Sequence, residues 1–224
     1  MTQKYEWIMF DADETLFHFK SFGGLCKTFA KYGIEFSQED FEAYEIVNKQ
    51  AWINYQDGKI TSVDLKTLRF SSWAKRIGVT PEQLNIEFLA SMVEVCTLYD
   101  GVLDILEYCQ GKYKMAVITN GFMDMQEERL KYHGIEQYFD LLVVSEEVGV
   151  AKPNKIIFNY ARSQMGNPPR DKILMVGDNV DSDILGGINA GLDTCWFNPR
   201  DVSIQRDFSA NYQISSMEQL RNII

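Results

Sequence analysis

Histidine and cysteine are scarce in this chain, and their positions argue against two classes of protein. The two histidines, His18 and His133, have no second histidine or cysteine at a metal-ligand spacing, which argues against a zinc site. The four cysteines are scattered and form no C-x-x-C pair. In a chain of 224 residues, so sparse a set is typical of buried, reduced thiols rather than of a secreted disulfide scaffold.

Basic residues are also in deficit. Lysine and arginine number 22 against 32 aspartates and glutamates, so the net charge is −10. A protein that binds duplex nucleic acid needs a basic face, so this balance argues against a nucleic-acid polymer as partner. A small anionic substrate stays compatible with it, because such a substrate needs only a local cluster of donors and a cation.

Long apolar runs are missing as well. No segment is long enough for a membrane-spanning helix, and the first residues lead into no signal-peptide pattern. We therefore expect a cytoplasmic protein without a membrane partner.

Short apolar runs rich in Val, Ile and aromatic residues recur along the chain. They lack the polar alternation of a half-exposed strand, and such continuous apolar runs are typical of strands buried on both faces of a parallel sheet. The predicted strands are Trp7 to Phe10, Met115 to Ile118, Leu141 to Val144, Ile173 to Val176 and Asp193 to Phe197. The predicted helices between the later strands are Val102 to Cys109, Met123 to His133, Ile156 to Met165 and Asp183 to Ala190. This alternation predicts an α/β fold with a doubly wound, mostly parallel sheet.

The gap between the first two predicted strands is too long for one crossover. It carries helix punctuation of its own: Ser37 with Asp40, Thr61 with Asp64, and the run Thr80-Pro81-Glu82-Gln83. We therefore expect an inserted all-helical domain at residues 17–98 and a core domain at residues 1–16 and 99–224. A last helix is predicted after Ser215 as N-cap, with Glu218 three residues on.

Two aspartates, Asp11 and Asp13, follow the first predicted strand at once. Residues two apart on a strand share one side, so the two carboxylates lean toward one point if the strand persists. Such a pair shares a proton or holds a cation, and it suits a nucleophile beside a proton carrier. The alternative is a helix N-terminus in which Asp13 or Thr15 only caps.

Polar residues also follow the other predicted strands. In an open α/β sheet, ligands bind outside the carboxyl ends of the strands, so these residues are expected to meet. They are Thr119-Asn120-Gly121, Lys152-Pro153, and Gly177-Asp178-Asn179 with Asp183. Each has a plainer interpretation: a turn, a solvated surface lysine, a turn residue, and a helix N-cap for Asp183. Their joint occurrence in this order favours one site.

These motifs together resemble those of the haloacid dehalogenase superfamily, and the helical insertion resembles its C1 cap. The second aspartate, Asp13, is a feature of the phosphatase branch. The stretches around Asp11 and Lys152, Trp7 to Phe17 and Ser145 to Asn154, further resemble bacterial pyrimidine 5′-nucleotidases of this superfamily. This resemblance implies hydrolysis of nucleoside monophosphates such as dUMP, UMP and dTMP.

The resemblance also implies a role for each site residue. Asp11 would attack phosphorus and Asp13 would carry the proton. Mg²⁺ would be bound by Asp11, the Asp13 backbone carbonyl and Asp178, with Asp183 and Asn179 in support. Thr119 and Lys152 would assist catalysis, and the phosphate would be bound by Thr15, Asn120, Gly121 and Lys152.

Two alternatives stay open from the sequence. The same site would serve a sugar-phosphate phosphatase or a phosphohexose mutase. A phospho-aspartate receiver also combines acidic residues, a threonine and a lysine on a doubly wound sheet, although the inserted helices and the proton carrier argue against it. The oligomeric state and the residues that read the substrate do not follow from the sequence.

Overall fold

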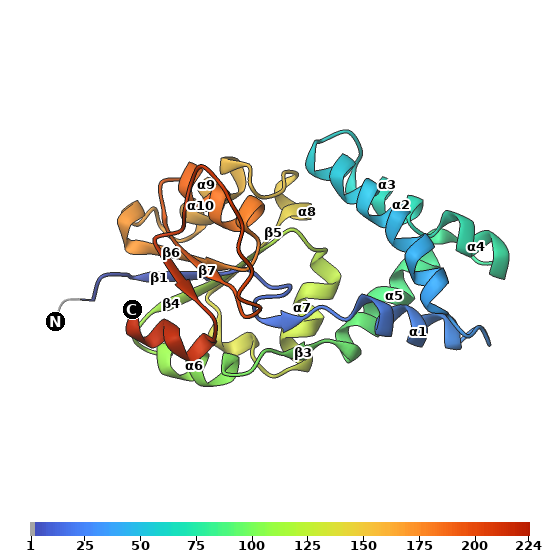
Figure 1. The fold of residues 1–224 in the computed structure, drawn as a ribbon, viewed down its shortest axis with the longest axis horizontal. Coiled ribbons are helices and arrows are strands. Elements are labelled where there is room, and N and C mark those ends of the chain that lie inside the picture. The colour runs from blue at the N-terminus through green and yellow to red at the C-terminus, as the bar shows by residue number, and fades with distance from the viewer. Residues whose placement is uncertain (1–2) are drawn as a thin grey trace. The chain divides into compact units, whose positions relative to one another are not determined.

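The computed structural model describes residues 3–224, and within them six strands form one parallel sheet (Figure 1). The strand order is β5-β4-β1-β6-β7-β8, so β1 lies in the interior with β4 and β6 as neighbours. The strands are β1 (Trp7–Phe10), β4 (Lys114–Thr119), β5 (Leu141–Val144), β6 (Ile173–Gly177), β7 (Asp193–Phe197) and β8 (Tyr212–Ile214). The predicted parallel α/β fold is confirmed.

The apolar strands are buried on both faces, as their sequences predict. Every residue of β1 is buried. Trp7 and Met9 pack with Ile157 and Phe158 of α9 on one face, and alternation directs Ile8 and Phe10 to the other. Figure 1 shows α9 and α10 on one side of the sheet and α6 on the other. The helices of this part are α6 (Val102–Cys109), α7 (Met123–Tyr132), α8 (Ser145–Val148), α9 (Lys155–Gln164) and α10 (Leu185–Asn189).

The segment between β1 and β4 is helical, as predicted. Its helices are α1 (Ser21–Ala30), α2 (Gln38–Gln56), α3 (Ser62–Leu68), α4 (Ser71–Ile77) and α5 (Pro81–Val95). Ser37 and Thr61 form reciprocal capping boxes with Asp40 and Asp64, and Thr80 accepts from the Gln83 N–H at the start of α5. These caps confirm the predicted helix starts. The aromatic Trp73 is buried against Phe29 and Phe36 in the core of this segment.

The chain divides into two compact units. One contains the sheet and comprises the described residues up to His18, Thr97–Met123 and His133–Ile224. The other comprises Phe19–Cys96 together with Asp124–Tyr132, so most of α7 clusters with the helical segment. A short antiparallel pair, β2 (Phe17–His18) with β3 (Thr97–Leu98), stands where the chain leaves and re-enters the first unit.

Two predicted helix starts are wrong. Asp183 does not cap a helix, because it lies inside a π-helical turn at Val180–Ile184 whose N-cap is Asn179. The Asn179 Oδ1 accepts from the backbone N–H groups of Asp181 and Ser182. Near the C-terminus the last helix is a 3₁₀ segment, Met217–Asn222, that follows Ser216 instead of Ser215 and has no side-chain cap.

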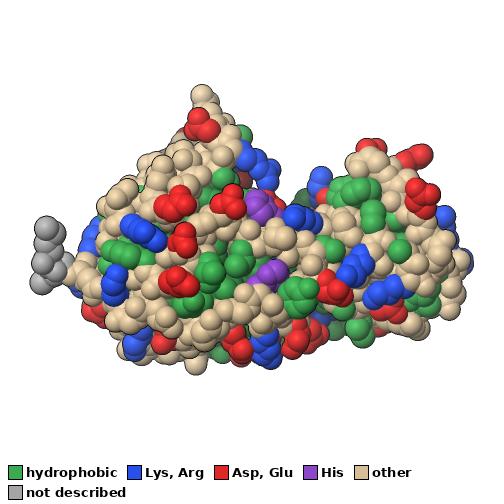
Figure 2. Space-filling model, turned by 90° about the horizontal axis from the view of Figure 1, so that it is seen from below, with side chains coloured by type: hydrophobic (Ala, Val, Ile, Leu, Met, Phe, Trp, Pro, Cys, Tyr) green, Lys and Arg blue, Asp and Glu red, His purple; other side chains and the backbone are tan. Residues whose placement is uncertain are grey.

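Surface charge and hydropathy agree with the composition. The face drawn in Figure 2 mixes acidic and basic side chains instead of gathering the basic ones. Among the described residues, no helix has the length and apolar character needed to cross a bilayer.

Candidate active site

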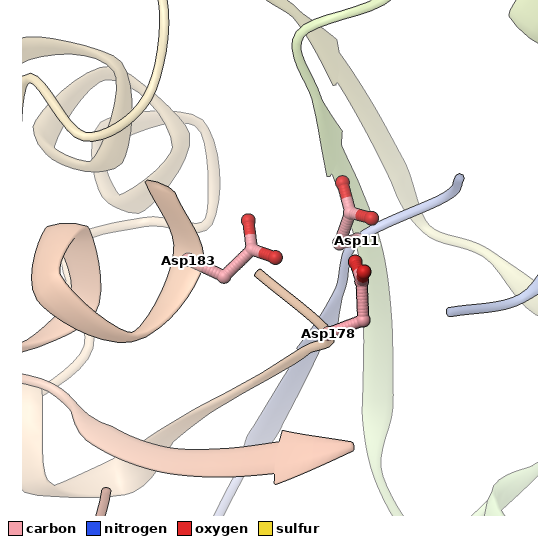
Figure 3. Close-up of side chains that lie close together, drawn as sticks. All are labelled: Asp11, Asp178 and Asp183. Atoms are coloured by element: carbon pink, nitrogen blue, oxygen red, sulfur yellow. The ribbon is translucent and has the colours of Figure 1, made fainter. Parts of the chain in front are cut away.

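Three carboxylates converge at the carboxyl end of the sheet. Asp11 follows β1, Asp178 follows β6, and Asp183 comes from the π-helical turn after it; Figure 3 shows the three side chains turned toward one another. One oxygen from each lies within 4.8 Å of the others. Such a set of hard oxygen donors can hold a metal ion.

A buried lysine lies between two of these carboxylates. Lys152 Nζ lies 2.5 Å from Asp11 Oδ1 and 2.7 Å from Asp183 Oδ1, and it donates to the Ile118 carbonyl at 2.8 Å. Only 1% of the residue is exposed. The lysine therefore fixes the Asp11 carboxylate in place and offsets part of the negative charge around it.

Burial dominates the protonation of this site. It is the main cause that raises the pKa of Asp11 to about 7 and that of Asp178 to about 8, with neighbouring carboxylates adding to both shifts. Burial acts to lower the pKa of Lys152, but Asp11 and Asp183 outweigh it and raise that pKa above its usual range. The lysine therefore stays charged, whereas two of the carboxyl groups can hold protons near neutral pH.

The residues predicted after β4 connect two loops by hydrogen bonds. The Asn120 side chain accepts from the Lys152 backbone N–H at 2.7 Å and donates to the Lys152 carbonyl at 3.0 Å. The Gly121 N–H donates to Thr119 Oγ1 at 3.1 Å. These contacts hold the loop after β4 against the loop that carries Lys152, which the sequence pattern did not predict.

A second tie joins the loops after β1 and β6. Thr15 Oγ1 accepts from the Asp178 N–H at 3.0 Å and lies 3.4 Å from its carboxylate. Asp13 is placed beside this tie, where a backbone bridge pairs it with Phe17. All the predicted site residues thus lie at one end of the sheet. The three-carboxylate group consists of Asp11, Asp178 and Asp183, and the Asp13 carboxylate is not one of its members.

Gly177 has a part that sequence analysis missed. A Cβ atom at this position would lie 2.4 Å from Asp183 Oδ2 and 2.6 Å from Asp183 Cβ. Any other residue would push the Asp183 side chain away from Lys152, because atoms do not pack so closely. The G-D-N run contains the signal, but the clash becomes evident only once Asp183 is placed.

The arrangement suits nucleophilic chemistry on an anionic group. A fixed carboxylate can attack, the adjacent ammonium can offset developing charge, and a cation between the aspartates can bind an oxyanion. A model of haloacid dehalogenase-like hydrolases matches residues 5–191. The chain belongs to this family.

Three similar proteins align with nearly the whole of this chain. Pyrimidine 5′-nucleotidase YjjG of Escherichia coli is 50% identical over 99% of this chain and 98% of its own. Pyrimidine 5′-nucleotidase PynA of Streptococcus pneumoniae is 28% identical over 96% and 93%. A solved structure of the putative HAD-hydrolase YfnB of Bacillus subtilis, bound to magnesium, superposes with a TM-score of 0.85, 30% identity and 99% coverage of both chains.

Proposed function

We propose that this protein is a Mg²⁺-dependent 5′-nucleotidase that hydrolyses pyrimidine nucleoside monophosphates such as dUMP, UMP and dTMP. The 50% identity to YjjG over 99% of the chain supports the substrate class. The observation that carries the chemistry is the buried Lys152 ammonium at 2.5 Å from the Asp11 carboxylate, which aims a nucleophile and offsets charge at one point. The proposed domains are a core at residues 1–16 and 99–224 and a helical cap at residues 17–98.

In the proposed mechanism Asp11 attacks phosphorus and forms an aspartyl phosphate. Asp13 protonates the ester oxygen as the nucleoside leaves, and then takes a proton from the water that cleaves the acyl phosphate. Lys152 offsets the charge on the phosphoryl oxygens. Splitting the reaction into two displacements divides a barrier that is very high for an unassisted phosphate monoester.

The acidic group fits a bound Mg²⁺, because one carboxylate oxygen from each of its three aspartates lies within 4.8 Å of the others. Asp11, Asp178 and the Asp13 carbonyl would hold the ion, with Asp183 and Asn179 supporting its surroundings. When bound, the ion supplies positive charge to the phosphoryl oxygens. Thr15, Thr119, Asn120 and Gly121 would shape the phosphate site around it.

A substrate panel tests this function. We expect phosphate release from dUMP, UMP and dTMP to exceed that from purine nucleotides and sugar phosphates, and to stop in EDTA. Faster release from a sugar phosphate would reassign the substrate to another phosphatase of this family. An acyl phosphate that outlives many catalytic cycles would instead indicate a receiver.

Mg²⁺ is expected to stabilise the protein more at pH 8 than at pH 6. Unfolded aspartates ionise near pH 4 (about 3.9), whereas burial keeps protons on Asp11 and Asp178 up to about 7 and about 8. The folded state therefore binds more protons in this window, and without metal its stability falls as the pH rises from about 4 to about 8. A cation replaces these protons, so its benefit grows over the same range. Melting temperatures in EDTA and in Mg²⁺ at both pH values measure the effect.

Asp178→Ala is the control for that experiment. It removes one of the two titrating carboxyl groups and one proposed ligand, so both the Mg²⁺ benefit and its pH dependence should shrink. A variant that gains as much from Mg²⁺ as the wild type would contradict the proposed metal site.

A further inference from the structure

We propose that Glu14 is a positioning residue for Asp13, held in place by Tyr99 and Arg200. The inference rests on the proposed function, because it assigns Asp13 the role of proton carrier. It concerns a residue that the motif pattern leaves without a role, between the aspartate that moves the proton and the threonine tied to Asp178.

The backbone at Glu14 has an unusual conformation. Its φ is +60°, a left-handed conformation that few residues other than glycine adopt readily. The Glu14 N–H donates to the Phe17 carbonyl at 2.7 Å, which closes the turn after β1. Glycine would adopt this conformation without strain, whereas glutamate supplies a carboxylate that neighbouring groups can bind.

The side chain of Glu14 accepts hydrogen bonds from two donors that are far from it in the sequence. Glu14 Oε2 accepts from the Tyr99 hydroxyl at 2.8 Å and from the Arg200 guanidinium at 2.6 Å. Tyr99 follows β3 and Arg200 lies in the loop after β7. Three separate segments of the sheet unit therefore meet at one carboxylate oxygen.

Tyr99 is itself rigidly placed. Its ring stacks on His18 with centroids 3.5 Å apart and meets Phe197 edge-on at 5.2 Å. Its backbone N–H donates to the Leu16 carbonyl at 3.0 Å, two residues past Glu14. Tyr99 is thus anchored by its backbone to the turn that holds Glu14, and by its ring to His18 of β2 and Phe197 of β7.

Asp13 is consequently flanked by two tethered neighbours. Thr15 is tied to Asp178 on one side, and Glu14 is tied to Tyr99 and Arg200 on the other. A cavity of about 150 Å³ borders both Glu14 and Asp178, so the turn has room to move once the carboxylate contacts are cut. The tether therefore decides where Asp13 stands in the phosphoryl-transfer step.

In that step an oxygen of Asp11 bonds to phosphorus while the bond from phosphorus to the ester oxygen breaks. The proton of the Asp13 carboxyl passes to that oxygen, and the nucleoside departs as a neutral alcohol. A p-nitrophenolate leaving group is stable without a proton, so its departure does not depend on where Asp13 stands. A displaced Asp13 should thus slow nucleotide cleavage selectively, whereas general damage to the site would slow both substrates.

The test compares kcat/KM for UMP and for p-nitrophenyl phosphate, because this ratio reports the steps up to the first irreversible one. Glu14→Gly relieves the left-handed backbone and removes the carboxylate. We expect it to fold as well as the wild type and to lower kcat/KM for UMP by about 10- to 100-fold, since a general acid contributes about 10²–10⁴-fold. The value for p-nitrophenyl phosphate should stay unchanged.

Three further variants sharpen the result. Glu14→Gln keeps an acceptor oxygen for both donors and should restore UMP cleavage. Arg200→Met should show the same selective loss. Adding it to Glu14→Gly should cause little further loss, because Glu14→Gly has already removed the contact between Glu14 and Arg200. Arg206→Met is the matched control: this arginine in the same loop pairs with Asp181 at 2.7 Å instead, and both substrates should be unaffected.

Equal losses on both substrates, or no loss on UMP, would overturn the positioning role. If the wild type cleaves p-nitrophenyl phosphate but not UMP, the nucleotide assignment fails separately. The comparison is then made with the alkyl phosphate that the wild type cleaves fastest, and the same selective loss is required.

Discussion

Asp11→Asn is expected to lower kcat by about 10⁵-fold or more, as removal of a nucleophile does in other covalent mechanisms. An amide oxygen is too weak a nucleophile to form the acyl phosphate. The fold should survive, because asparagine resembles the neutral carboxyl form that burial already favours at Asp11. Single-turnover release of phosphate from UMP, followed beside circular dichroism, measures both effects.

The matched change for this experiment is Asp181→Asn, an exposed aspartate in the turn after β6 that pairs with Arg206. It should retain activity close to that of the wild type. Phosphate release by Asp11→Asn at more than a small fraction of the wild-type rate would mean that another group attacks phosphorus.

Lys152→Met is expected to destabilise the fold by about 3–5 kcal/mol in the absence of metal, because it leaves Asp11 and Asp183 without their buried cation. Loss of the ammonium should also lower kcat by about 10²–10³-fold, the usual effect of removing one charge-stabilising donor. Denaturant unfolding in EDTA measures the first effect and steady-state kinetics measures the second.

The pH dependence of the same variant separates charge from packing. Lys152 lowers the pKa of Asp11, so without it the Asp11 carboxyl holds its proton to higher pH, and the destabilisation should be smaller at pH 5 than at pH 8. An equal deficit at both values would instead indicate lost packing. Lys27→Met is the control, because its ion pair with Glu94 is exposed (side chains 40% and 48% exposed) and should contribute less than about 1 kcal/mol.

The sequence predicts the buried strands well because burial on both faces leaves a clear pattern. The observed bounds of β1, β5 and β7 equal the predicted ones. The edge strand β8 and the two-residue strands β2 and β3 escaped prediction, since segments so short carry no periodic signal. The sequence places Asp183 at a helix start and not inside a π-helical turn, because such a turn has no distinct sequence signature.

The site shows the same division. Strand ends of a parallel sheet meet at one edge, so the convergence of Asp11, Lys152 and Asp178 could be expected from their order. The parts played by Glu14 and Gly177 could not, because each depends on a contact that only the fold fixes: with Arg200, far along the chain, for Glu14, and with Asp183, in the turn after β6, for Gly177. The reciprocal contact between Asn120 and Lys152 likewise follows from the fold alone.

The placement of Lys152 has a consequence for the order of events. One ammonium stands among three carboxylates, so the fully ionised centre carries an excess of two negative charges. A phosphate dianion approaching such a centre is repelled at short range, and low polarity strengthens that repulsion. Protons on Asp11 and Asp178 cancel this excess up to about pH 7 and about pH 8. Above that range the divalent ion must cancel it, so ion and nucleotide should load in compulsory sequence there, the ion first.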